Sequence, residues 1–589
     1  MVSALGFLAW PDRAPSAIFE RISAFKQHKQ SPINELPQEL VDRISDYLDT
    51  KDLENTLLLS QKFQHAAERK SGAFCTFTLT RSNASKFLSI YSTRRLRYLR
   101  HVWFKTSVFS REDEAEEDCC DTANELKVMD EDFTRQIRFL FETLQTLETS
   151  TDRSHGSGKI HLVIYTPTRE INERGYCQHI WFSSWRVHLS SLATIPKVLS
   201  VRTFTMQTPE RRFYSDGPKI ALRKIDYRVL LDIASRLPNL ELLQCNIAGD
   251  EWHTGFHQRY WPIMKDSEGP RRDSRHDFRK ALVGFQEAAS CLRHAQLDFL
   301  FPNDEVRRID QREALPNLVK PCDYDPLSTS LRILSYPLRT LTLRGVADET
   351  LFWPADGSVP SWPNLESISV MFHLSTPSGT WYFRGLPGIG ATQSYEITDD
   401  MYPPFKTIER DYDEDHDLVN KNAYHESYGV FFRTEPNENT LVPFLAAFAK
   451  ATAFMPSLKR AALWCPLNFG PDESDIPEYE DFKWEQVSRI SSLDSNSNLA
   501  WGVAYSAPGT EAFSTSPGIE NSDSRQIWWR TAGWRPDTKL HTMFQEIGRD
   551  TYDEALDEYF VDDYAGAGLH YVDDFEDAWW RSFPQELPV

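Results

Sequence analysis

A short apolar pattern recurs along most of this 589-residue chain, and it constrains the fold more than any other feature. The pattern is apolar-x-x-apolar-x-apolar. Its last two positions alternate, as they do in a short strand that buries one face. Each copy therefore predicts a strand, and successive copies begin between 27 and 93 residues apart. The eight copies are Leu99/Val102/Phe104, Ile160/Val163/Tyr165, Val201/Phe204/Met206, Leu240/Leu243/Cys245, Leu292/Ala295/Leu297, Leu338/Leu341/Leu343, Leu365/Ile368/Val370 and Leu458/Ala461/Leu463.

Amphipathic helices are predicted ahead of three of these strands. Apolar residues recur with a helical period over residues 133–147, 278–289 and 441–455. Parallel strands need crossover connections long enough to hold a helix. We therefore expect Leu243, Leu297, Leu341 and Ile368 to lie on neighbouring strands of one curved parallel sheet, all pointing inward.

A Pro-Asn step punctuates the chain ahead of several strands. It occurs in residues 237–240, 315–318 and 362–365, and residues 455–458 have Pro-Ser instead. Because proline ends a helix and the following leucine can enter a strand, the predicted repeat is helix, turn and strand.

This repeat resembles leucine-rich repeats in a degenerate form. The resemblance implies an irregular α/β solenoid with long insertions, the largest between about residues 373 and 439. Only the shortest spacing fits the usual repeat length, and the usual Asn or Cys after the strand is inconsistent. The alternative is an unrelated α/β body whose strands share the same alternation.

The segment from Pro32 to about Phe74 has a different character and predicts a compact helical unit. Pro37 suits a first helical turn, and Leu40, Ile44 and Leu48 form an apolar stripe. A second apolar set follows Asp52, whose side chain is expected to support the next helix start. Gly72 marks the end of the last helix. A unit this small cannot bury all its apolar surface alone.

This segment resembles an F-box. The matching positions are Leu36-Pro37, Glu39-Leu40, Ile44, Leu48, Asp52-Leu53 and Phe63, where many members of the family have Trp. The resemblance implies docking on a Skp-type adaptor and, through it, on a cullin. The alternative is a helical hairpin packed on its own domain. The implied adaptor-binding residues are Leu36, Pro37, Leu40, Ile44, Leu48, Leu53, Leu57 and Phe63.

The sequence divides into four parts: an N-terminal arm (1–31), the F-box (32–75), the irregular leucine-rich-repeat-like solenoid (76–467) and an acidic, Trp-rich C-terminal region (468–589). The fold class is thus α/β. The tryptophans of the last part are expected mainly to cap the solenoid. The alternative is a target-binding surface, since Trp and Arg are frequent at binding hot spots. Its candidate residues are Trp528, Trp529, Arg530, Trp534 and Arg535.

Charge and cysteine content narrow the class of partner and the compartment. The formal net charge of −21 disfavours nucleic acid and favours a protein target with a basic patch. Eight scattered cysteines suit a reducing compartment. There is no signal-peptide pattern and no apolar run long enough to span a membrane. We expect a cytoplasmic or nuclear protein.

No catalytic, cofactor or metal motif is found, so we expect neither an enzyme nor a cofactor. The preferred function is the substrate-recognition subunit of a Skp–cullin–F-box ubiquitin ligase, with a target not identified by the sequence. One alternative is an F-box scaffold that acts outside a cullin ligase. The other is an enzyme with a pocket in the Trp-rich region.

Overall fold

The fold is given by a computed structural model that describes residues 35–108, 123–150, 159–170, 186–209, 220–222, 225–248, 272–301, 309, 311–385, 390–397, 432–467, 499–513, 523–552, 555–561 and 575–576. The predicted N-terminal arm (1–31) and much of the predicted acidic C-terminal region lie outside these residues.

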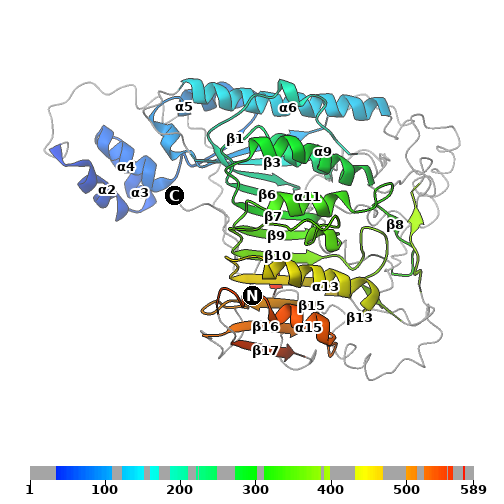
Figure 1. The fold of residues 1–589 in the computed structure, drawn as a ribbon. Coiled ribbons are helices and arrows are strands. Elements are labelled where there is room, and N and C mark those ends of the chain that lie inside the picture. The colour runs from blue at the N-terminus through cyan, green and yellow to red at the C-terminus, as the bar shows by residue number, and fades with distance from the viewer. Residues whose placement is uncertain are drawn as a thin grey trace, which may run out of the picture.

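One large sheet dominates the described part of the chain (Figure 1). Twelve strands follow one another in chain order, and a thirteenth, β5 (Ile220–Leu222), pairs with β3. All neighbouring pairs along the chain-ordered path from β1 to β14 are parallel, whereas β5 is antiparallel to β3. Strand β15 is antiparallel to both of its neighbours, and β17 is parallel to β16. The strands in order are β1 (Thr76–Leu79), β2 (His101–Ser107), β3 (Ile160–Glu170), β4 (Val201–Gln207), β6 (Leu242–Ala248), β7 (His294–Phe301), β9 (Thr340–Gly345), β10 (Ser367–Phe372), β14 (Arg460–Leu467), β15 (Leu499–Ser506), β16 (Arg525–Arg530) and β17 (Leu556–Val561).

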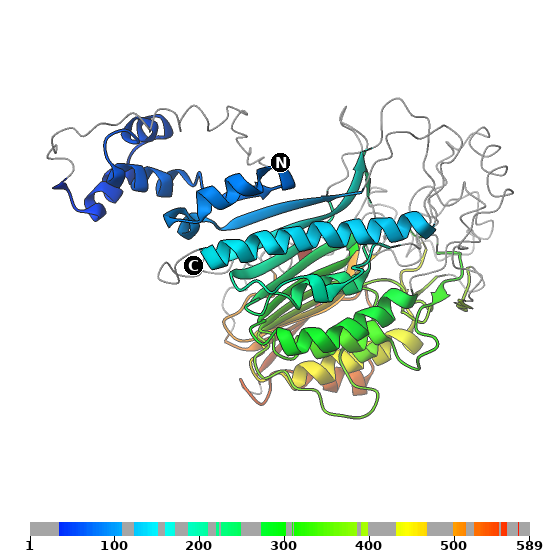
Figure 2. The same cartoon turned by 90° about the horizontal axis from the view of Figure 1, so that it is seen from above.

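Helices alternate with these strands and cover one face of the sheet (Figures 1 and 2). The three helices predicted from periodicity are present as α6, α9 and α13. The helices of the body are α5 (Ala84–Tyr91), α6 (Ala123–Ser150), α7 (Tyr227–Ala234), α9 (Arg272–Ala288), α11 (Pro326–Ser335), α13 (Glu438–Ala453) and α15 (Thr538–Gln545). Short 3₁₀ helices are η2 (Arg81–Asn83), η3 (Arg94–Tyr98), η5 (Leu192–Thr194) and η7 (Glu349–Leu351).

A continuous hydrophobic core lies between the sheet and these helices. Seven of the eight predicted triplets place all three side chains in it. Leu243, Leu341 and Ile368 occupy one row across the strands, and Leu297 lies in the next inward row. The predicted neighbouring parallel strands with inward-pointing residues are therefore confirmed.

The triplet on β3 is the exception. Ile160, Leu162 and Ile164 belong to the core, whereas Val163 and Tyr165 do not. Regular alternation along β3 places Ile160, Leu162 and Ile164 on the helix-covered face, where Leu162 and Ile164 pair with Val102 and Phe104 of β2. Alternation then directs Val163 and Tyr165 to the other face, so their predicted inward orientation is wrong.

Three of the four proline-punctuated segments lead into a strand as predicted: 237–240 into β6, 362–365 into β10 and 455–458 into β14. The segment 315–318 is different. Its Pro316–Asn317 forms a two-residue strand, β8, that pairs with β12 (Tyr395–Glu396). The chain instead enters β9 through Pro337-Leu338, directly after α11.

The described part of the predicted large insertion lies between β10 and α13. It contains β11 (Phe383–Arg384), which pairs with β13 (Glu435–Pro436), and β12.

The N-terminal helices are α2 (Gln38–Asp46), α3 (Thr50–Thr56) and α4 (Gln61–Ser71). They stand apart from the sheet near its β1 end, as Figures 1 and 2 show.

Candidate functional site

The three N-terminal helices form a small unit with its own core. Val41 on α2 packs with Phe63 and Ala66 on α4, and Leu36 covers them. Lys62 Nζ donates to the Leu36 carbonyl at 2.7 Å, which joins the start of α2 to α4. This core fixes which face of α2 points outward.

The ends of these helices follow from side-chain capping. Asp49, rather than the predicted Asp52, caps α3, because its carboxylate accepts the Asp52 backbone N–H at 2.8 Å. Ser60 accepts from the Phe63 N–H at 3.3 Å and caps α4. Gly72 ends α4 with φ of 64°, a left-handed conformation that costs glycine little.

An apolar surface is left exposed on the outer face of α2. Leu40, Ile44 and Tyr47 follow one another at helical spacing, with exposed fractions of 46%, 42% and 90%. Leu58 and Leu59, just after α3, are also about half exposed. We call these five residues the F-box apolar surface. Exposed aliphatic and aromatic side chains gathered on one small unit indicate a protein-binding site.

The structure places the eight predicted adaptor-binding residues in three different environments. The exposed residues are Pro37, Leu40 and Ile44; the half-buried ones are Leu36, Leu48 and Leu57; and the buried ones are Leu53 and Phe63. The two buried residues support the unit from inside. Tyr47, Leu58 and Leu59 were missing from the predicted set, although the apolar spacing through Tyr47 was a signal for one of them.

The second candidate surface is the face of the sheet that the helices leave open. A polar ladder crosses it from β3 to β7, in which His161 Nε2 meets Thr205 Oγ1 at 2.8 Å. Thr205 donates to Gln244 Oε1 at 2.9 Å, and Gln244 Nε2 donates to Gln296 Oε1 at the same distance. These side chains are only partly buried. The open face therefore carries an ordered row of partly exposed polar groups.

Farther along the same face, the polar ladder gives way to aromatic side chains. A second apolar cluster there includes Trp464, Trp528, Phe513 and Phe575. The Arg530 guanidinium lies 3.6 Å from the centre of the Phe513 ring, within the range of a cation–π contact. In the C-terminal half of this face the side chains are therefore mainly aromatic, and they bury one another together with Arg530.

The predicted Trp-rich cluster is divided between the two faces. Trp529 is fully buried on the helix-covered face, 4.7 Å from the Phe544 ring of α15. Trp528 is on the open face and stacks on Tyr559 at 4.2 Å. Arg530 is buried, Trp534 is half-buried and Arg535 is exposed. Alternation along β16 separates Trp528 from Trp529, and Trp534 and Arg535 lie beyond the end of that strand.

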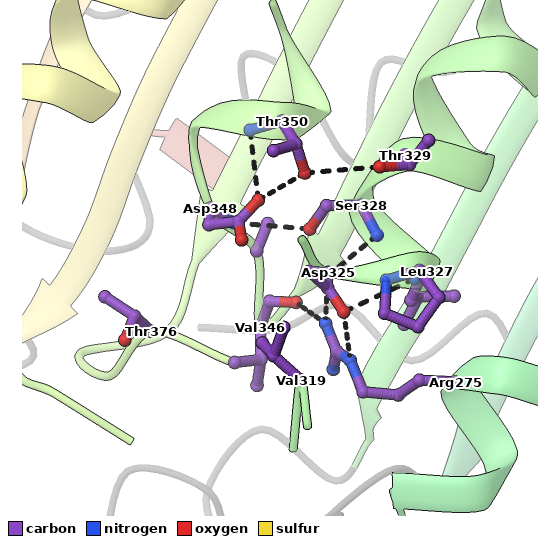
Figure 3. A network of polar contacts seen from close by, with 12 residues as sticks. Arg275, Val319, Asp325, Leu327, Ser328, Thr329, Val346, Asp348, Thr350 and Thr376 are labelled. Carbon is purple, nitrogen blue, oxygen red and sulfur yellow. Dashed lines mark hydrogen bonds and ion pairs between the residues drawn. The ribbon is translucent and has the colours of Figure 1, made fainter. Parts of the chain in front are cut away.

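A buried ion pair fastens two helices of the body (Figure 3). Arg275 on α9 donates to the Asp325 carboxylate at 2.7 and 2.6 Å, and both side chains are fully buried. Asp325 also caps α11 by accepting the Ser328 N–H at 2.8 Å. Arg275 donates further to the Val346 carbonyl at 2.8 Å. Because no atom of the pair meets solvent, the network positions helices rather than binding a ligand.

A second carboxyl group lies beside this pair (Figure 3). Asp348 accepts from the backbone N–H of Thr350 at 3.0 Å. Burial, and then the charge of Asp325, raise the pKa of Asp348 to about 7. In Asp325 the cost of burial is outweighed by Arg275, and its pKa is lowered. The two neighbouring carboxyl groups therefore differ in their affinity for a proton.

Comparison with known proteins identifies one part of the chain. Residues 33–72 match the F-box domain family. No curated protein matches the chain. Within the residues that the structure describes, no helix is long and apolar enough to cross a membrane, and no group of three His, Cys, Asp or Glu is placed to hold a metal ion. The chain therefore contains an F-box domain, which suggests a substrate adaptor of the Skp–cullin–F-box type that binds a Skp-type partner.

Proposed function

We propose that this chain is the substrate-recognition subunit of a Skp–cullin–F-box ubiquitin ligase. The observation that carries the proposal is the F-box apolar surface, in which Leu40, Ile44 and Tyr47 lie exposed on a helix whose opposite face is buried. In this role the F-box binds the adaptor, and the body binds a protein target. The transfer chemistry belongs to other subunits, so the chain requires no cofactor.

The adaptor contact is driven by burial of the F-box apolar surface. Fully burying a leucine or isoleucine side chain contributes about 1.5–3 kcal/mol. Leu40 and Ile44 have roughly half of that area still exposed to water. Truncating a binding hot spot costs about 2 kcal/mol or more, so we expect Leu40→Ala with Ile44→Ala to weaken adaptor binding roughly 100- to 1,000-fold.

The body is proposed to be an irregular leucine-rich-repeat-like solenoid that presents its open face to the target. Support comes from the chain-ordered parallel strands and from the helices that cover only one face. Further support comes from the partly exposed polar ladder of Thr205, Gln244 and Gln296. Open sheet faces of repeat proteins are frequent binding surfaces.

The test is co-purification of the full chain with a Skp-type adaptor and a cullin. The double variant Leu40→Ala, Ile44→Ala is compared with Val283→Ala, which removes a 65% exposed aliphatic side chain from α9 in the body. We expect the double variant to lose both partners and the control to keep them. Adaptor binding by the double variant at the wild-type level would contradict the proposal.

The same experiment separates this function from its alternative. An F-box scaffold that acts outside a ligase would bind the adaptor without a cullin, and none of its partners would be ubiquitinated. A substrate receptor would instead retain undegraded targets when the F-box is disabled. Quantitative comparison of the proteins captured by the wild type and by the double variant therefore distinguishes the two.

A further inference from the structure

Two residues near the end of the chain lie against the aromatic half of the open face. Phe575 is fully buried and stacks on Trp464 of β14, with ring centroids 5.0 Å apart and planes within 14°. The Phe575 ring is nearly perpendicular to the Phe513 ring, with centroids 5.2 Å apart, and the Arg530 guanidinium lies 5.4 Å from the Phe575 ring centre. A phenylalanine ring therefore fills a slot that is built from two aromatic rings and a cation.

The next residue forms an ion pair on the same face. Arg344 of β9 donates to the Glu576 carboxylate at 3.0 Å. Arg344 is only 8% exposed and also lies 3.3 Å from Asp298, a buried neighbour on β7. The Arg344 guanidinium is thus held in place by the sheet and reaches a carboxylate supplied from elsewhere in the chain.

The sheet register fixes the distance between the ring slot and this cation. Arg344 pairs with Met371, which pairs with Trp464, so the two binding groups are two strands apart in one row. Neighbouring strands are about 4.8 Å apart, which separates the groups by roughly 10 Å. Side chains of two consecutive residues can span this distance, as Phe575 and Glu576 do.

A glycine in the same row makes room for the aromatic rings. Gly502 pairs with Trp464, and a Cβ atom at Gly502 would lie 2.6 Å from the Trp464 Cβ. Any larger residue would displace Trp464 from its position under Phe575. The row from Arg344 to Gly502 thus combines a buried cation, an aromatic floor and the space that the ring requires.

We propose that this row is a binding site for a target segment in which an aromatic residue is followed by an acidic one, and that Phe575 and Glu576 occupy it as an internal ligand. The proposal rests on the proposed function as a receptor, and it names the class of segment that the open face binds. The net charge of the chain favours a basic target. For the residue that contacts Arg344, however, the positive charge of Arg344 favours an acidic side chain, because more distant surface charges are screened.

The internal ligand sets the affinity that a target must reach. A segment of the same chain competes at an effective concentration that is typically in the millimolar range. An added peptide is therefore expected to bind the wild type weakly, and to bind more tightly when Phe575 and Glu576 are replaced. This change in affinity is what separates a ligand site from a permanently closed part of the fold.

The experiment measures fluorescence polarisation of a labelled peptide that has the sequence of residues 571–581, added to the full chain. We expect the double variant Phe575→Ser, Glu576→Ser to bind it at least about tenfold more tightly than the wild type does. Adding Arg344→Ala to the double variant is expected to abolish this gain. The control Arg384→Ala, an exposed arginine paired with Glu435 on the β11–β13 pair, should leave the gain intact.

Equal peptide binding by the wild type and the double variant would overturn the proposal, and so would binding that does not depend on Arg344. If the double variant does not fold, Glu576→Gln replaces it, because it keeps the ring in its slot and removes only the charge. The affinity of Glu576→Gln for the peptide is then expected to exceed that of the wild type several-fold, and an unchanged affinity would contradict the proposal. Adaptor binding should be unchanged in every variant, and its loss would count against the receptor function instead.

Discussion

The Glu68 carboxylate of α4 lies 2.6 Å from Nη2 of Arg95 in η3, and this contact joins the F-box to the body. Arg94 approaches the same carboxylate at 3.3 Å. The Glu68 side chain is only 4% exposed, and Arg95 also lies over the Phe74 ring at 4.2 Å. Glu68 is thus a buried carboxylate of the F-box that pairs with two arginines of η3. We infer that these ion pairs fix the angle between the adaptor-binding helices and the sheet. That angle decides where a target on the open face would be presented.

Glu68→Gln is expected to loosen this joint. It leaves Arg95 without its counter-charge, and breaking a buried pair in this way costs about 3–5 kcal/mol. Because Arg95 retains 15% exposure, we expect about 2–3 kcal/mol here. Hydrogen exchange of residues 61–71 and 94–98 should accelerate, while adaptor binding persists. The control is Arg69→Ala, on the same helix as Glu68, which breaks a more exposed pair with Asp42 of α2 and should cost less than about 1 kcal/mol. Equal rates of hydrogen exchange in both variants would contradict the role of Glu68 in joining the F-box to the body.

Aromatic residues of the F-box should separate into two classes of variant, one that unfolds the unit and one that weakens adaptor binding. Phe63→Ala removes a buried ring from the F-box core and is expected to cost about 3–5 kcal/mol, which unfolds so small a unit. Tyr47→Ala removes a 90% exposed ring and should leave the fold unchanged while it weakens adaptor binding. Circular dichroism of the variants and adaptor pull-down measure the two effects separately. Loss of structure in Tyr47→Ala would contradict this assignment.

The pattern of strands could be read from the sequence because alternation is a local property. Leu341-x-Leu343 and Ile368-x-Val370 specify an inward face whatever lies beside them. The failure at Val163 has a specific cause. The predicted triplet took Ile160, Val163 and Tyr165, whereas the side chains of β3 alternate as Ile160, Leu162 and Ile164, a second apolar pattern that the sequence also contains.

Contacts between distant residues could not be predicted in this way. Glu576 meets Arg344 from 232 positions away, and no local pattern around either residue indicates this contact. The Trp528-Trp529 pair looked like one cluster in the sequence. On a strand, however, adjacent side chains point to opposite faces, so one tryptophan lies under α15 and the other lies on the open face.

Trp529 is expected to act as a structural cap. It is fully buried between Phe544 of α15 and Phe560 of β17, and replacing such a ring with alanine costs about 3–5 kcal/mol. Trp529→Ala should therefore lower the melting temperature of the full chain by several degrees, as measured by calorimetry. Arg535→Ala, which removes an exposed guanidinium 4.4 Å from the Phe560 ring, is the control and should change it little. A stable Trp529→Ala variant that loses captured partners would instead place the residue on the target-binding surface.

Asp348 is expected to make the stability of the body depend on pH. Its pKa is raised to about 7 by burial and by Asp325, whereas an aspartate in the unfolded chain titrates near 3.9. Between these values the folded state binds more protons than the unfolded state does, so the stabilisation is present at low pH and is lost as pH rises from about 4 to 7. Each pH unit in this window changes the free energy of unfolding by up to about 1.4 kcal/mol.

Asp348→Asn cannot titrate, and its amide oxygen can still accept from Thr350. Urea unfolding at pH 5 and pH 8 should therefore show a smaller loss of stability in Asp348→Asn than in the wild type, and parallel losses would show that Asp348 is ionised in the folded protein throughout.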